Sequence, residues 1–171
     1  LLIIIIFLYY ALSGPKYDGA YEKKIEDGMI INPIVKLSDE QALEQFNETF
    51  VHYILVSIKA YNLHNAPLSQ ELPKIEFYID EDVYGAEIEK GNIRVNKGKI
   101  IGKDIIIKTT KVEAIKMLKE RVYIEQSFNQ GNSEIELIAS KSTLFGKGYL
   151  SLYTELTGKS ITGGVIRVYT E

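Results

Sequence analysis

Cysteine and tryptophan are both absent from the 171-residue sequence, and histidine occurs only twice, as His52 and His64. Without cysteine the chain can form no disulfide, no thiol nucleophile and no thiolate-bound metal site. Two histidines are too few for a histidine-rich metal centre. No phosphate-binding loop and no nucleophile–base pair in a recognisable order is found either. We therefore predict no cofactor, no metal and no enzymatic activity.

A strong charge of either sign is also lacking. The formal net charge is −3 and the pI is about 5.6, whereas nucleic-acid-binding domains usually carry a basic stripe. We therefore exclude nucleic acid as a partner. The hydrophobic content of 46% and charged content of 25% predict one globular domain with a sizeable core and a short appendage. Abundant isoleucine, lysine and glutamate without cysteine or tryptophan is typical of thermophiles.

The appendage is the N-terminal run LLIIIIFLYYAL, residues 1–12, which contains no charge. A membrane-spanning helix needs about 20 apolar residues, so these twelve do not complete one. Four interpretations stay open: the outer end of a membrane anchor, the remnant of a signal peptide, a strand donated to a neighbouring subunit, or a buried strand of the chain's own core. We predict membrane or subunit contact through Leu1, Leu2, Ile3, Ile4, Ile5, Ile6, Phe7, Leu8, Tyr9 and Tyr10.

The segment Lys74–Lys108 predicts the centre of the fold. Alternating apolar and polar residues, glycine turns at Gly91 and Gly98, and the run Ile105–Ile107 are typical of closely spaced strands. With Glu134–Ala139 and a last strand at residues 165–170, the predicted fold is α+β. It has an antiparallel sheet of five to six strands, helices packed on one face, and the apolar N-terminal segment in front.

Three helices are predicted around this sheet. Ser38 with Gln41 forms a capping box at the start of a helix that runs to Tyr61. Thr110 with Glu113 opens the second, and the third spans residues 149–156. Between residues 15 and 37 we expect a linker with short edge strands at 29–31 and 34–35, and a polar loop at 140–143. The predicted organisation is an anchor or inserted segment at 1–14, linker and edge strands at 15–37, and the α+β domain at 38–171.

Residues 72–158 follow the order of motifs that characterises one family. A hairpin at 88–95 with Gly91 leads to the strand 104–108 and the capped helix 110–119; Phe128 and Gly131 then precede the strand at 135–137. This pattern resembles the sterol carrier protein 2 family (SCP2-like). The chain departs from the family in its N-terminal extension, in the polar loop at 140–143, and in a C-terminal strand where the family often has a covering helix.

The resemblance implies a five-stranded sheet with helices on one face that enclose an apolar tunnel for lipid-like ligands, without catalysis. On that basis the predicted pocket lies between the sheet and the side chains of Leu118, Phe128, Leu144, Leu152 and Leu156. We predict a membrane-tethered domain that binds lipid or another apolar ligand and faces outside the cytoplasm. The alternative is a structural subunit of an extracellular or cell-surface filament or ring, joined through residues 1–12.

Overall fold

A five-stranded sheet forms the centre of the fold in a computed structural model that describes residues 3–6, 14 and 16–159. The order of the strands across the sheet is β3-β2-β1-β4-β5. The strands are β1 (Lys74–Ile79), β2 (Asp82–Glu89), β3 (Asn92–Lys97), β4 (Ile105–Thr109) and β5 (Glu134–Leu137). The α+β class and the five strands agree with the prediction from the sequence.

The sheet is mixed, which corrects the predicted antiparallel arrangement. β1 pairs in parallel with β4, with Ile75 opposite Ile105, while the other neighbouring strands are antiparallel. After edge strand β3, residues 98–104 return past β2 and β1 before β4 begins. Three strand spacings amount to roughly 14 Å, which seven extended residues can cover because they span roughly 23 Å. A crossover of this kind starts the new strand at the same end as β1, so the two run in parallel.

This crossover lies against the helix-free face of the sheet, where it contacts two residues on neighbouring strands. Gly85 and Glu76 are paired across β2 and β1. A Cβ atom on Gly85 would lie only 2.8 Å from Ile100 Cβ. Beside it, the buried Glu76 carboxylate accepts from Ile100 N at 2.8 Å and from Lys103 Nζ at 2.6 Å. A glycine and a buried acid therefore fix the crossover to the sheet.

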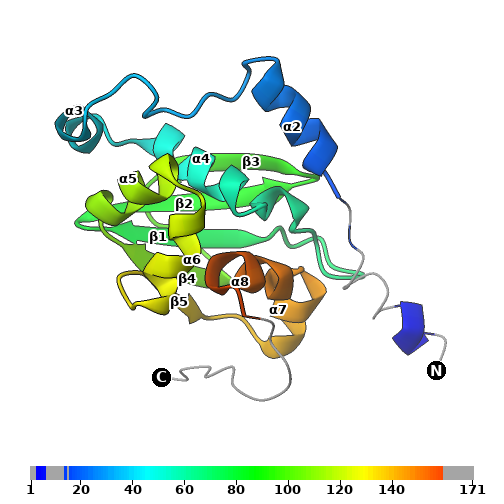
Figure 1. Cartoon of the computed structure of the whole chain (residues 1–171). Helices are drawn as coiled ribbons and strands as arrows, with labels where there is room; N and C mark the ends of the chain where they lie inside the picture. Colours follow the sequence, from blue (N-terminus) through cyan, green and yellow to red (C-terminus); the bar gives the residue numbers. More distant parts are fainter. Residues whose placement is uncertain (1–2, 7–13, 15, 160–171) are drawn as a thin grey trace.

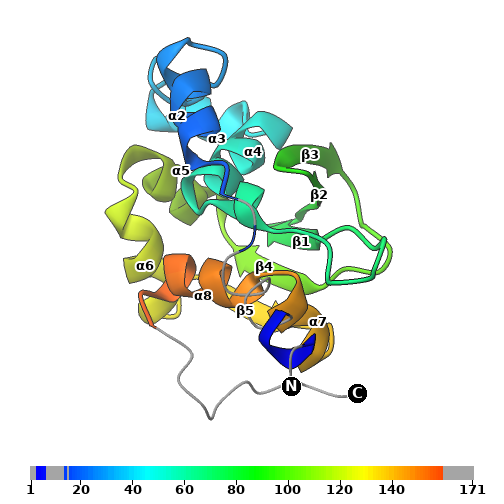
Figure 2. The same cartoon turned by 90° about the vertical axis from the view of Figure 1, so that its right-hand side faces the viewer.

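The helices lie on the opposite face of the sheet (Figures 1 and 2). This face buries Ile75, Phe77 and Ile79 of β1 together with Ile105 and Ile107 of β4. The helices are α2 (Asp18–Glu26), α3 (Asp39–Glu44), α4 (Glu48–Ser57), α5 (Lys111–Lys119), α6 (Val122–Asn129), α7 (Lys141–Gly146) and α8 (Tyr149–Thr157), with a 3₁₀ turn η1 (Ala60–Asn62).

The predicted helix starts are confirmed, but the long first helix is interrupted. The capping box of Ser38 and Gln41 starts α3, and the Thr110 hydroxyl accepts from Glu113 N at the start of α5. The helix predicted over 38–61 ends after Glu44, because Asn47 adopts an extended conformation and its side chain accepts from Thr49 N. Asn47 thereby caps a second helix, α4, so the chain changes direction between the two.

Two other local predictions are wrong. Residues 29–31 and 34–35 are bends and turns instead of edge strands, and most of the predicted linker before them is helix α2. Tertiary contacts explain this, because Tyr21 of α2 stacks on Tyr61 at 4.2 Å and Asn32 Nδ2 donates to Leu118 O at 2.7 Å. The predicted polar loop at 140–143 starts helix α7, capped by Ser140. The strand predicted at 165–170 lies outside the described residues.

Candidate functional site

A groove of about 550 Å³ runs beside edge strand β5, between helices α6 and α8. Its apolar lining consists of Phe128, Ile135 and Tyr153, one residue from each of the three elements. The Asn129 side chain donates to Thr157 O at 2.9 Å and so joins the ends of α6 and α8 beside the groove. Its polar lining consists of Lys108, Asn129, Gly131, Ser133, Glu134, Glu136, Thr157 and Lys159. The groove therefore offers aromatic and aliphatic contacts with hydrogen-bonding groups around them.

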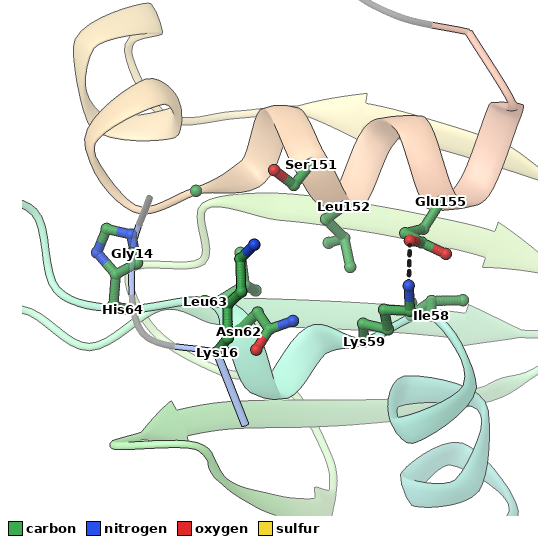
Figure 3. Close-up of a pocket in the computed structure, with 11 residues that line it drawn as sticks. Gly14, Lys16, Ile58, Lys59, Asn62, Leu63, His64, Ser151, Leu152 and Glu155 are labelled. Atoms are coloured by element: carbon green, nitrogen blue, oxygen red, sulfur yellow. Dashed lines mark ion pairs between the residues drawn. The ribbon is translucent and has the colours of Figure 1, made fainter. Parts of the chain in front are cut away.

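A second, smaller hollow of about 100 Å³ lies between the segment of Gly14 and Lys16, the 3₁₀ turn η1 and helix α8 (Figure 3). Ile58, Leu63 and Leu152 line it together with the polar side chains of Lys16, Asn62, His64 and Ser151. One side is closed by the ion pair of Lys59 with Glu155, at 2.9 Å. A water molecule takes up about 30 Å³ of liquid, so this hollow has room for a few waters and is too small for a lipid chain.

A buried ion pair joins several loops at the points where they meet the sheet. Lys147 Nζ lies 2.9 Å from Asp104 Oδ1, 3.0 Å from Oδ2 and 3.0 Å from Leu72 O, which uses all three of its N–H donors. Asp104 Oδ2 also accepts from Lys74 N at 2.8 Å. Both charged side chains are at most 5% exposed. Because each charge has its partners, this cluster joins the segments before β1 and β4 to the start of helix α8.

The Tyr149 hydroxyl completes this cluster. It lies 3.0 Å from Asp104 Oδ2 and 3.1 Å from Lys74 O. Burial, together with the neighbouring Asp104 charge, raises the pKa of Tyr149 well above its ordinary value. The tyrosine thus stays neutral and acts as a hydrogen-bond donor, so it supplies no base for catalysis near neutral pH.

A second buried polar network surrounds Glu113 of helix α5. Its carboxylate accepts from Lys116 Nζ at 2.9 Å, from Tyr123 OH at 2.9 Å and from Ser127 Oγ at 2.8 Å. Ser127 in turn lies 2.8 Å from Ser133 Oγ. Burial by itself would raise the pKa of Glu113, but the hydrogen bonds from Lys116, Ser127 and Tyr123 outweigh it and lower the pKa. The network joins α5 to α6 and to the turn before β5.

The five residues predicted to line a pocket lie in different surroundings. Phe128 lines the groove beside β5, and Leu152 lines the small hollow of Figure 3. Leu118, Leu144 and Leu156 belong to the core, each with at most 4% of its surface exposed. The role of all five as ligand contacts stays a prediction. The sequence-based set did not include Ile135 and Tyr153, although alternation in β5 and the spacing in α8 had placed both on these elements.

Of the ten N-terminal contact residues, Ile3, Ile4, Ile5 and Ile6 are described. They form a helical turn, and their side chains are 54–81% exposed. Leu1, Leu2, Phe7, Leu8, Tyr9 and Tyr10 lie outside the described residues. None of the helices in the described part of the chain has both the length and the apolar character needed to cross a membrane.

Comparison with known proteins gives similarity among solved structures alone. No family model matches the sequence, and no curated protein matches it. The chain is similar to the sterol carrier protein 2-like 2 of Aedes aegypti, with 14% identity, a TM-score of 0.32, and coverage of 51% of this chain and 84% of that one. It is similar to sterol carrier protein 2 of Yarrowia lipolytica, with 14% identity, a TM-score of 0.30, and coverage of 71% and 88%.

A third similar structure is a stereoselective inverting sec-alkylsulfatase from Pseudomonas sp., with 11% identity, a TM-score of 0.40 and coverage of 69% of this chain. The chain spans only 17% of that enzyme's length. The resemblance to sterol carrier protein 2 is confirmed in architecture, because the chain itself has the expected five-stranded sheet with helices on one face. At these identities the similarity concerns the fold alone and says nothing about a ligand.

Proposed function

We propose that this protein is a non-catalytic domain that binds a lipid or another apolar ligand in the groove beside β5. The observation that carries the proposal is the groove itself, with Phe128, Ile135 and Tyr153 converging from three elements. Its volume of about 550 Å³ falls within the range of about 300–1,000 Å³ that is usual for small-molecule sites. The order of motifs in residues 72–158, which resembles the sterol carrier protein 2 family, also implies a ligand of this class.

The chemistry of the lining favours a molecule with an apolar body and a polar end. Two aromatic rings and one isoleucine provide dispersion contacts. Of the charged residues at the edge of the groove, Lys108 pairs with Glu136 at 2.9 Å and Glu134 adds a second acid, so Lys159 is the cation that can meet a carboxylate or phosphate end. A fatty acid or a phospholipid is therefore the class of ligand that best matches both parts.

The paired state of the buried ionisable groups supports a role without catalysis. Asp104 and Lys147 neutralise each other, and Glu113 is saturated by three donors. Catalytic acids and bases usually have partners that leave a proton position open to the substrate. These groups instead use their hydrogen-bonding capacity on the protein, which is typical of structural networks.

Binding of the fluorescent fatty acid cis-parinaric acid to the full chain tests the groove. We expect Tyr153→Ala to weaken binding about tenfold, because losing one aromatic contact removes about 1.4 kcal/mol. Tyr53→Ala is the matched control, since Tyr53 is also half-buried on a helix but lies outside the groove. Solvent extraction and mass spectrometry of the purified chain should find a bound lipid. Equal binding by both variants, or no binding by the wild type, would refute the proposal.

Tethering through residues 1–12 is a separate part of the proposal. The exposure of Ile3–Ile6 supports it, because four neighbouring isoleucines in water are unfavourable unless a membrane or a protein covers them. We propose a membrane contact with the domain facing outside the cytoplasm. Flotation of the full chain with lipid vesicles, lost when residues 3–6 are changed to serine, is the expected result.

The same exposed isoleucines support the alternative, a subunit of a cell-surface filament or ring. In that case the wild type should assemble without lipid, and the assemblies should be visible by electron microscopy. The serine variant should then be monomeric, whether or not vesicles are present.

A further inference from the structure

Several loops of the fold lie together at one end of the sheet, which we call the loop end. β1 and β4 are parallel and both begin there, so the segment 63–73 and residues 101–104, the last part of the crossover, meet at this end (Figure 1). β2 is antiparallel to β1, which brings the turn at Lys90 and Gly91 to the same place. Figure 2 views the molecule from this side.

The N-terminal segment joins the fold at the same end. A Cβ on Gly14 would lie 2.3 Å from the His64 ring, and one on Gly91 would lie 2.7 Å from the Tyr17 ring. Tyr17 N also donates to Asn62 Oδ1 at 2.9 Å. Gly14 and Tyr17, which follow the apolar run in the sequence, therefore lie at the loop end.

Two large aliphatic side chains project fully into solvent at the loop end. Leu68 is 108% exposed and Ile101 is 91% exposed. The two loops are neighbours, since Gln70 and Gly102 line one hollow and Lys74 Nζ donates to Ile101 O at 3.1 Å. Single apolar side chains at the tips of separate loops give no continuous surface for a folded protein partner, but they can each enter a fluid lipid layer.

The turn that carries Leu68 is strained. Ser69 N donates to Ala66 O at 3.0 Å, and Leu68 has φ +65° in the third position of this turn. That position favours glycine or asparagine over a bulky residue. An apolar side chain at a strained, fully exposed position is a common mark of a functional contact.

The charges at the loop end suit an anionic surface. Lys16 and Lys90 are exposed and form no ion pair with any described residue. Glu71 and Glu89 are the exposed acids beside these loops; Glu89 pairs with Arg94 at 3.1 Å, and Asp104 is buried against Lys147. The excess of lysine contrasts with the net charge of −3 for the whole chain.

We propose that the loop end docks on an anionic lipid bilayer, with Leu68 and Ile101 inserted between the lipids and Lys16 and Lys90 at the headgroups. This contact goes beyond the proposed ligand groove and uses none of its lining residues. The Asp104–Lys147 pair holds the bases of both loops, and Gly146 lies against Ala66, so the two tips are presented from a fixed frame.

The absence of cysteine permits a direct test by site-specific labelling. Leu68→Cys and Ile101→Cys in the full chain are labelled with the fluorophore NBD and mixed with phosphatidylcholine vesicles that contain phosphatidylglycerol. We expect a blue shift and higher intensity for both labels. Val122→Cys is the control, because Val122 is 84% exposed at the start of α6, away from these loops, and its label should stay in water.

The unlabelled variant Leu68→Ser should bind the vesicles about tenfold more weakly, and added salt should weaken binding because lysines contribute. The proposal is overturned if the chain floats with the vesicles while the labels at 68 and 101 stay in water, which would leave the N-terminal segment as the sole contact. It is overturned equally if the fluorescence of these two labels shifts to the blue when the protein concentration is raised in the absence of vesicles. Binding of cis-parinaric acid measures the groove independently of either result.

Discussion

The buried pair of Asp104 and Lys147 gives the sharpest prediction for stability. In Lys147→Met, Asp104 keeps its hydrogen bonds from Lys74 N and Tyr149 but loses the charge that neutralises it, and Leu72 O loses its donor. Removing one partner of a buried pair costs about 3–5 kcal/mol. Since domains are stable by about 5–15 kcal/mol, this variant should lose a large share of its free energy of unfolding.

The double variant Asp104→Leu with Lys147→Met should recover part of this loss. It leaves no buried charge, although Lys74 N loses its acceptor and Leu72 O its donor, at about 1–2 kcal/mol each, while the Tyr149 hydroxyl keeps Lys74 O as an acceptor. We therefore expect a cost of about 2–4 kcal/mol for the double change. The two single changes, at about 3–5 kcal/mol each, should together cost about 4–6 kcal/mol more than the double change, because the two residues are in direct contact.

Urea unfolding followed by circular dichroism at neutral pH measures these free energies. The matched control is Lys108→Met, because Lys108 pairs with Glu136 at the same distance of 2.9 Å with side chains 49% and 30% exposed. An exposed pair is worth about 0–1 kcal/mol. The reasoning fails if Lys147→Met costs no more than Lys108→Met, or if the costs of the two buried single changes simply add.

Four further predictions concern other parts of the fold. The hydrogen bonds to Glu113 lower its pKa, so the ionised carboxylate stabilises the fold at pH values above the ordinary pKa of about 4.3, and this stabilisation is lost as the pH falls through the pKa of the folded state. In urea unfolding, the loss of unfolding free energy caused by Glu113→Gln should therefore become smaller toward acid pH. A loss that stays constant with pH would contradict this. Gly85→Val should lower the free energy of unfolding by about 2 kcal/mol, since its side chain meets Ile100; Gly19→Ala, in open space on helix α2, should raise it by about 0.5–1 kcal/mol. Leu68→Asn should relieve the strain of the positive φ at this turn and increase the free energy of unfolding by about 1 kcal/mol, which raises the melting temperature. The same change should weaken binding to vesicles. A lower melting temperature together with weaker binding would show that Leu68 packs on the protein.

Helix starts and strand segments were readable from the sequence because their causes are local. The capping residues Ser38 and Thr110 act within one turn of their own helix. Alternation in Ile75–Ile79 reports which face of a strand is buried, whatever lies beside it. Of the candidate site, the sequence pointed to Phe128, the aromatic residue that precedes Gly131 and the strand at 135–137 in the order of motifs that resembles the sterol carrier protein 2 family.

Strand direction, the break after Glu44 and the residues that meet Phe128 in the groove were decided by the tertiary structure. Alternation does not specify which strand is the neighbour, so the parallel pairing of β1 with β4 depends on the crossover at 98–104, which Gly85 and Glu76 hold in place. Likewise, Lys147 is a residue of a glycine-rich turn in the sequence and becomes a buried partner of Asp104 only when distant segments pack. The sequence by itself determined the local elements, because their energies come from neighbours along the chain; only the folded chain decided the mixed sheet, the groove and the buried charges, because those energies come from residues far apart in sequence.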